Sequence, residues 1–288
     1  MDRPTLGPVA FRTATDPLAP RWALSSLGPL RAGAAATARV ELENAGAATW
    51  RSVGEEGLQL SHHWLDPRGN AIVWDGPRTP FPRPVATGEQ VSLEVALVAP
   101  RPPGRYVLRL DLVEEHRFWL SEVGVATLDV EVVVEPRIAA RRLGVHVHQG
   151  SGDAAATLAA LAAQEEPPVD DEPTAVAHLV AGAVPAPDWS RLLLDAHAEG
   201  WGVVGPGLEP DGRTLARRRE ARRLAAWTSA GRNPRFGRPL LLPSVVVEGV
   251  AATVGVAEGL PAAGPSADAL FEGRARVRLP TRSGRPSG

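Results

Sequence analysis

The sequence contains no cysteine and no lysine among its 288 residues. The absence of cysteine excludes disulfide bonds, iron–sulfur clusters, thiolate zinc sites and cysteine nucleophiles. All 31 basic residues are arginines, whose planar guanidinium groups make bidentate contacts that lysine cannot make, although the codon usage of a GC-rich genome explains the bias more simply. The formal net charge of -2 provides no global field that would favour nucleic acid or an anionic membrane.

Long hydrophobic runs are also missing. No stretch approaches the roughly 20 apolar residues that cross a bilayer, and residues 1–20 lack an apolar core of signal-peptide length. We therefore expect a cytoplasmic protein without a transmembrane segment, whose residues 1–20 form a loosely held arm. The length allows two domains with a core each, and the apolar fraction of 44% is that of a globular protein.

Residues 21–136 show a β pattern. Short runs that alternate or are rich in β-branched residues are bounded by Gly, Pro, Asn or Asp. They are ARVELEN, LQLSHHW, NAIVW, VSLEVALV, RYVLRLDLV and TLDVEVVV. Strands in this number without a helical interval predict an antiparallel β-sandwich, and Asp66-Pro67-Arg68-Gly69 predicts a hairpin turn between two of them.

Residues 137–279 show strand–helix alternation instead. The strand-like runs are RLGVHVH, AVAHLV and WGVV, and the helix-like runs are AAATLAALAAQ, DWSRLLLDAHAEG and RTLARRREARRLAAW. Asp188 is placed to cap the start of the second helix and Gly200 its end. Such alternation predicts parallel strands in a truncated α/β domain, followed by a disordered tail over 280–288.

Five of the eight tryptophans fall in the predicted sandwich. They are Trp22, Trp50, Trp64, Trp74 and Trp119. The stretches HHWLDPRGN, PGRYVLRLDLVEE and FWLSEVG resemble an immunoglobulin-like module of bacterial glycan-synthesis and methyltransferase-type proteins. The N-x-G-x-x-x-W arrangement is more distantly similar to the four-tryptophan domain of an autophagy receptor.

The predicted hairpin carries the candidate ligand-binding residues of this domain. Exposed aromatic rings can stack on the apolar faces of sugars, and nearby carboxylates can accept hydrogen bonds from hydroxyl groups. Trp64, Trp74, Asp66 and Asp75 flank the turn and are therefore candidates for binding a glycan. The alternative, which is the commoner role of tryptophan in a sandwich, is that the rings fill the core.

The stretch LVAGAVPAPDW, residues 179–189, resembles a hallmark of family 2 glycosyltransferases, which have the GT-A fold. The stretches TLAALAAQEEPP, GWGVVGPGLEP and GRNPRFGRP support the resemblance. It implies a nucleotide-sugar site in which Asp188 of the P-D-W element contributes to ligand binding. In that family the preceding strand typically ends in Asp-x-Asp, whose carboxylates hold Mg²⁺ or Mn²⁺ against a diphosphate.

This sequence departs from the family pattern at the residues that matter for catalysis. Val180 and Gly182 stand where the two metal-binding acids would be. Asp268 is the one acid left of an acidic pair, so it is the one candidate for a general base. Only ten residues separate Gln164 from Ala175, which is too few for the strand and helix that grip the base. The resemblance therefore implies lost catalysis, with no cofactor.

Other groups offer weaker sites. Arginines on or beside the segment 213–238, among them Arg232 and Arg235, can replace a metal as phosphate ligands, or can simply form a solvated helix face. The loop Gly150–Gly152 can cradle a phosphate, although Asp153 opposes an anion there. His146 and His148 share a strand face, but two imidazoles without a third ligand make a weak metal site.

Three hypotheses follow. In the first, the chain is a non-catalytic protein of bacterial surface-polysaccharide synthesis that binds a glycan or a glycan-synthesis enzyme and does not bind nucleic acid. In the second, it is an active nucleotide-sugar transferase, either metal-independent through arginines or using Mg²⁺ or Mn²⁺. In the third, it is a purely structural interaction protein. The missing acids favour the first hypothesis.

Overall fold

The computed structural model describes residues 18–53, 56–149, 153–209, 231–233, 252–255 and 268–279. The chain divides into two compact units. The first comprises Met1–Leu30, Ala35–Val98 and Arg105–Val133, and the second comprises Arg31–Ala34, Ala99–Gly104 and Val134–Gly288. The expected arm before Leu18, the tail over 280–288, the loop at 150–152, the arginine-rich helix and Arg235 lie outside the described residues.

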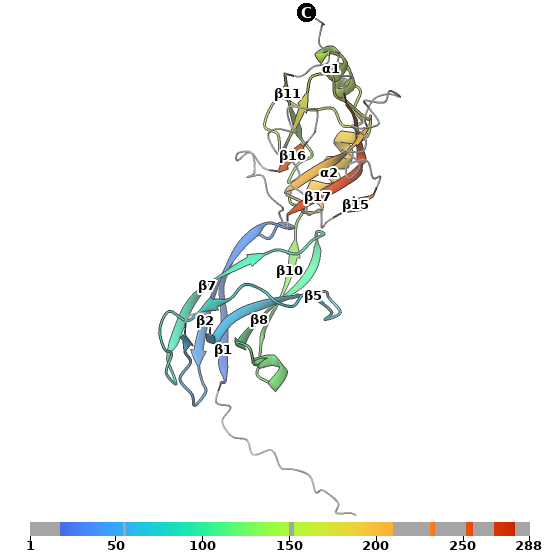
Figure 1. Cartoon of the computed structure of the whole chain (residues 1–288). Coiled ribbons are helices and arrows are strands. Elements are labelled where there is room, and N and C mark those ends of the chain that lie inside the picture. Colours follow the sequence, from blue (N-terminus) through green and yellow to red (C-terminus); the bar gives the residue numbers. More distant parts are fainter. Residues whose placement is uncertain are drawn as a thin grey trace, which may run out of the picture. The chain divides into compact units, whose positions relative to one another are not determined.

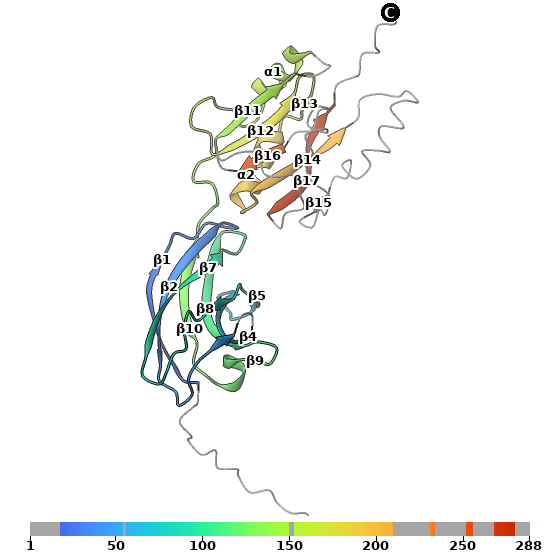
Figure 2. The same cartoon turned by 60° about the vertical axis from the view of Figure 1, so that its left-hand side comes forward.

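The first unit is built from two antiparallel sheets (Figures 1 and 2). One sheet has the order β1-β2-β7, formed by β1 (Pro20–Leu27), β2 (Ala35–Asn44) and β7 (Gln90–Val98). The other has the order β10-β8-β4-β3, formed by β10 (Leu128–Val134), β8 (Gly104–Glu114), β4 (Glu56–Leu65) and β3 (Ser52–Val53). The short strands β5 (Ala71–Val73) and β6 (Thr79–Pro80) pair with β4, and β9 (Phe118–Trp119), followed by the 3-10 helix η1 (Leu120–Val123), pairs with β8. These sheets agree with the predicted β-sandwich.

Side-chain alternation explains why these segments form strands with a buried face. In β7 the residues Val91, Leu93 and Val95 are buried while the residues between them are exposed. Because successive side chains of a strand point to opposite faces, this pattern directs one face of the sheet into an apolar core. In the second sheet Leu108 and Leu110 of β8 are fully buried in the same way.

The second unit has a seven-stranded mixed sheet with the order β11-β12-β16-β14-β17-β13, with β15 paired to β17. Its strands are β11 (Leu143–His148), β12 (Ala175–Val180), β13 (Val184–Pro185), β14 (Val203–Glu209), β15 (Arg232–Asn233), β16 (Ala252–Gly255) and β17 (Ala269–Arg278). The described residues of this unit also form the helices α1 (Ala154–Ala162) and α2 (Trp189–Ala198) (Figure 2). Trp189 and Leu193 of α2 belong to one apolar cluster with Phe271 of β17.

The predicted GT-A-like α/β architecture of this unit is wrong. The described residues contain only two α-helices, and the sheet is not parallel. Among the described strands, parallel pairing is limited to β11 with β12 and β14 with β17, whereas β16 is antiparallel to both of its neighbours. The strand–helix alternation was correct locally, but β16 and β17 come from segments in which we predicted no strand.

Of the two α-helices in the described residues, one begins with an ordinary side-chain cap. Asp153 precedes α1 and accepts a hydrogen bond of 2.8 Å from the backbone N–H of Ala155. Asp188 occupies the same position before α2 but makes no side-chain capping bond, so the predicted cap is not formed by its carboxylate. Among the helices of the described residues, none is long and apolar enough to cross a membrane.

Candidate functional site

The turn between β4 and β5 is organised by Asp66. Its carboxylate accepts hydrogen bonds of 2.8 Å from the backbone N–H groups of Arg68 and Asn70 and from Asn70 Nδ2. The side chain of Asn70, followed by its backbone N–H, lowers the pKa of Asp66 below its ordinary value. The predicted hairpin is therefore confirmed, and these contacts of the Asp66 carboxylate all lie within the turn.

The two tryptophans that flank the hairpin have different environments. Trp64 lies opposite Leu108 on the core side of the sheet and is 0% exposed, so its ring presents no surface to a ligand. Trp74 directly follows β5 and is 41% exposed. Its ring stacks on the imidazole of His63, with ring centroids 4.1 Å apart and an interplanar angle of 22°. Of the two, Trp74 alone offers an aromatic surface.

The side of the Trp74 residue that faces the sheet contacts buried polar and aromatic groups. His63 is fully buried, and its Nδ1 donates a hydrogen bond to the carbonyl oxygen of Trp74. His63 Nε2 lies 3.4 Å from Oδ2 of the buried Asp111. Trp119 contacts Trp74 edge-on, with centroids 6.1 Å apart. Stacking, hydrogen bonding and edge contact together fix the orientation of the exposed ring.

A charged pair lies beside this platform. Asp75 follows Trp74 in sequence, and its Oδ1 accepts a bond of 2.6 Å from Nη1 of Arg78. The guanidinium of Arg78 also bonds to Glu115 and lies 4.8 Å from the centroid of the Trp119 ring. The Asp75 side chain is 70% exposed, so one carboxylate oxygen faces solvent near the platform with its position set by Arg78.

The platform continues along one face of the β4–β8–β10 sheet. In the antiparallel β4–β8 register, His63 lies opposite Arg109 and Leu65 lies opposite Val107. Residues directly opposite one another point to the same face, so Arg109 and Val107 share the face that Trp74 covers. Arg109 makes a bidentate pair with Asp129 of β10, with bonds of 2.8 and 2.7 Å. We call this the outer face.

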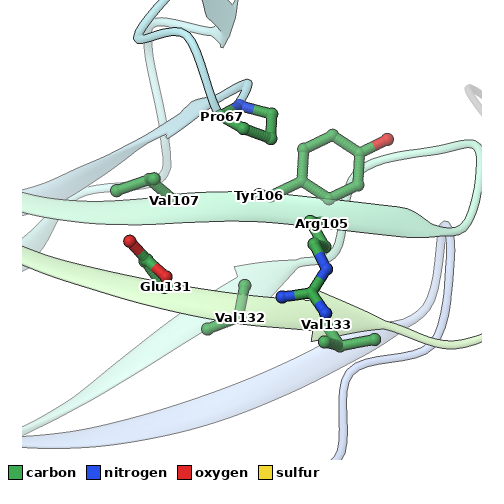
Figure 3. A pocket seen from close by; sticks show the side chains of 7 residues that line it. All are labelled: Pro67, Arg105, Tyr106, Val107, Glu131, Val132 and Val133. Carbon is green, nitrogen blue, oxygen red and sulfur yellow. The ribbon is translucent and has the colours of Figure 1, made fainter.

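A cavity of about 220 Å³ opens farther along β8 and β10. It is lined by Pro67, Arg105, Tyr106, Val107, Glu131, Val132 and Val133. Figure 3 shows the Arg105 guanidinium reaching from β8 over β10, with Pro67 of the hairpin turn on the other side of the strand. Among the described residues, neither Arg105 nor Glu131 has an ion-pair partner. The cavity therefore offers one free guanidinium and one free carboxylate between apolar walls.

The predicted site residues of the second unit are engaged in local contacts. Arg232 pairs with Glu199 and, at 2.7 Å, with the fully buried Glu272 of β17. The side chain of Val180 is buried in the core. Asp188 makes a long ion pair of 3.8 Å with Arg191. In the described part of the chain, these ion pairs of Arg232 and Asp188 are made with residues other than Asp268.

Asp268 is held in place by hydrogen bonds from neighbouring residues. Its Oδ1 accepts from Nη1 of Arg137 at 2.8 Å and from the backbone N–H of Gly202 at 3.2 Å. Its backbone oxygen accepts from the N–H groups of Gly202 and Val203 at 3.1 Å each. These contacts join the start of β17 to the start of β14, which is a structural role.

Replacement of Asp268 tests that role. We expect Asp268→Asn to lower the free energy of unfolding of the second unit by about 1–2 kcal/mol, because the charge-assisted bond to the largely buried Arg137 is lost. Urea unfolding followed by circular dichroism measures the change. Asp188→Asn is the matched control, because its longer ion pair should cost little; equal losses for the two variants would contradict the assignment.

The sequence pattern did not identify His178 as part of a cluster with His146 and His148. His146 and His148 share a face of β11 as expected, and His178 of β12 lies between them, with ring centroids 5.3 Å and 5.2 Å away. Burial, followed by the charges of His148 and His146, lowers the pKa of His178 below its ordinary value. His178 is the histidine of the strand-like run AVAHLV, and the parallel register of β11 with β12 places it opposite His146. This histidine was therefore visible in the sequence, but its partner was not.

No family model and no curated protein matches the chain. Several solved structures show likenesses with TM-scores of 0.23–0.24 and sequence identities of 10–16%. A β-glucosidase from Listeria innocua in complex with gluconolactone is 16% identical over 39% of this chain and 16% of its own, at a TM-score of 0.24. The ASH/PapD-like domain 7 of human CEP192 is 12% identical over 46% of this chain and 96% of its own, also at 0.24. This chain spans only a small part of the β-glucosidase, and scores of this size support no inference about function.

Proposed function

We propose that the chain is a non-catalytic binding protein whose first unit holds an oligosaccharide on the outer face of the β4–β8–β10 sheet. The observation that carries this proposal is the exposed ring of Trp74, which rests on buried His63. A pyranose ring has an apolar C–H face that stacks on such a platform, and a ring already held in place loses little conformational entropy on binding.

The polar groups of the outer face complement that stacking. The exposed carboxylate of Asp75, the bidentate Arg109–Asp129 pair and the free charges of Arg105 and Glu131 supply both donors and acceptors. Planar carboxylate and guanidinium groups bind pairs of neighbouring hydroxyls in fixed directions. A short oligosaccharide with one residue on Trp74 would reach toward the cavity along this face. A role in bacterial surface-polysaccharide synthesis stays a prediction.

Substitution of Trp74 tests the proposal. After a glycan screen of the full chain identifies a bound oligosaccharide, we expect Trp74→Ala to weaken its binding by about tenfold or more, which equals 1.4 kcal/mol of lost stacking. Isothermal titration calorimetry measures the affinity. Trp74→Phe keeps a smaller aromatic face and should lie between the wild type and Trp74→Ala.

Ile72→Ala is the matched control, because Ile72 is an exposed apolar residue of β5 near the platform. It should leave glycan affinity unchanged. Equal affinity of the wild type and a folded Trp74→Ala variant would overturn the proposal. Binding of a protein partner that depends on both Ile72 and Trp74, without glycan binding, would instead support an interaction module.

A further inference from the structure

The cavity beside β8 and β10 holds two opposite charges that do not pair with each other. The guanidinium of Arg105 and the carboxylate of Glu131 both line it, and both side chains are exposed. Figure 3 shows their charged ends apart, with Val132 between them in this view. Since neither group forms an ion pair with a described residue, the cavity presents one cation and one anion to a ligand.

The same two strands carry a matching pair of charges that is closed. Arg109 follows Arg105 on the same face of β8, and Asp129 precedes Glu131 on the same face of β10, because residues two or four apart in a strand share a face. Nε and Nη2 of Arg109 donate to the two carboxylate oxygens of Asp129, at 2.8 and 2.7 Å. Arginine and carboxylate readily form this bidentate contact. Arg105 and Glu131 leave the equivalent contacts open.

The chemical complement of this arrangement is a small zwitterion. A ligand carboxylate fits the planar fork of Arg105, and a ligand ammonium group donates hydrogen bonds to Glu131. A ligand with one charge alone would leave one of these groups unpaired and would face the other with its own sign. The volume of about 220 Å³ is smaller than that of pockets for drug-sized molecules. The rest of the lining is largely apolar and consists of Pro67, Tyr106, Val107, Val132 and Val133.

We propose that the cavity binds a free α-amino acid with an apolar side chain, with its carboxylate on Arg105 and its ammonium group on Glu131. Both charged groups of an α-amino acid are attached to one carbon, so they can reach two sides of a small space. The apolar side chain packs against walls such as Val107 and Val133. Trp74 does not line this cavity, so the proposal is independent of oligosaccharide binding.

Titration of the full chain with L-leucine tests the site. In protein with methyl-labelled valine, the NMR resonances of Val107 and Val133 should shift with a dissociation constant of about 1 mM. 4-Methylpentanoate and 3-methylbutylamine are leucine without its ammonium group and without its carboxylate, respectively. Each should bind about three- to tenfold more weakly than leucine, because one charged contact of an exposed site is lost.

Substitutions assign the two contacts. Glu131→Gln should abolish the advantage of leucine over 4-methylpentanoate, and Arg105→Gln should abolish its advantage over 3-methylbutylamine. Glu94→Gln is the matched control, because Glu94 is an exposed carboxylate of β7 that does not line the cavity. It should leave the affinity for leucine unchanged. The proposal is overturned if leucine shifts neither valine, if it binds no more tightly than its two analogues, or if Glu94→Gln weakens it as much as Glu131→Gln.

Discussion

Trp64→Ala should destabilise the first unit by about 3–5 kcal/mol, which is the usual cost of truncating a fully buried large aromatic side chain. Trp64 has no exposed surface, lies opposite Leu108 in the register and contacts His62 edge-on, with ring centroids 6.0 Å apart. The alanine side chain would leave a cavity that these neighbours can fill only in part. Such a loss is a large share of the total stability of a domain.

Thermal unfolding followed by circular dichroism measures this effect. A loss of that size lowers the Tm of a domain of about 100 residues by roughly 10–20 °C or more. Trp74→Ala is the matched comparison, because the half-exposed ring of Trp74 should cost much less when removed. If the Trp74 variant were the less stable of the two, the division between a core tryptophan and a surface platform would be wrong.

Acid should destabilise both units, because each contains a buried neutral histidine. Burial, then the charge of His63, lowers the pKa of His62 to about 4. Burial also lowers the pKa of His197 to about 4; the hydrogen bond to the Trp201 carbonyl opposes the shift, and Arg137 adds to it. Unfolded, each imidazole has a pKa near 6.5, so below that pH the unfolded chain binds protons that the folded chain does not.

The stability that these neutral rings provide is complete above about pH 6.5 and is lost as the pH falls toward 4. By pH 5 the loss is about 2 kcal/mol for each histidine. Urea unfolding at pH 7.5 and pH 5 measures it, and His62→Leu and His197→Gln should each flatten the pH dependence of their own unit. The exposed His116 is the control, and its replacement by Asn should change nothing; unflattened profiles in both test variants would refute the explanation.

Local patterns of the sequence predicted individual elements well. The alternation of QVSLEVALV and the turn residues around Asp66 encode β7 and the β4–β5 hairpin, because each depends on neighbours close in sequence. The helix α2 follows from its apolar face in the same way. In the second unit the order of the sheet depends on β16 and β17, which pair with strands far away in the sequence. Such pairing cannot be predicted from neighbouring residues, so the predicted α/β fold was wrong there.

The candidate site was predictable only in part. Trp64 and Trp74 looked alike as tryptophans beside a turn, and their burial is decided by the register of β4 with β8, which places Trp64 toward the core. The histidine cluster shows the same limit. His146 and His148 are two apart in sequence, whereas His178 joins them only through the parallel pairing of β11 with β12.

The position of β16 determines when the second sheet can form during synthesis. In the described residues, β12 and β14 are joined through β16, although β16 is the only one of the three that follows residue 250. Until the ribosome has released that segment, β12 and β14 each keep an unpaired edge, the kind of surface that recruits other nascent chains. A polypeptide truncated before Ala252 should therefore have a soluble first unit joined to an aggregation-prone, incomplete second unit.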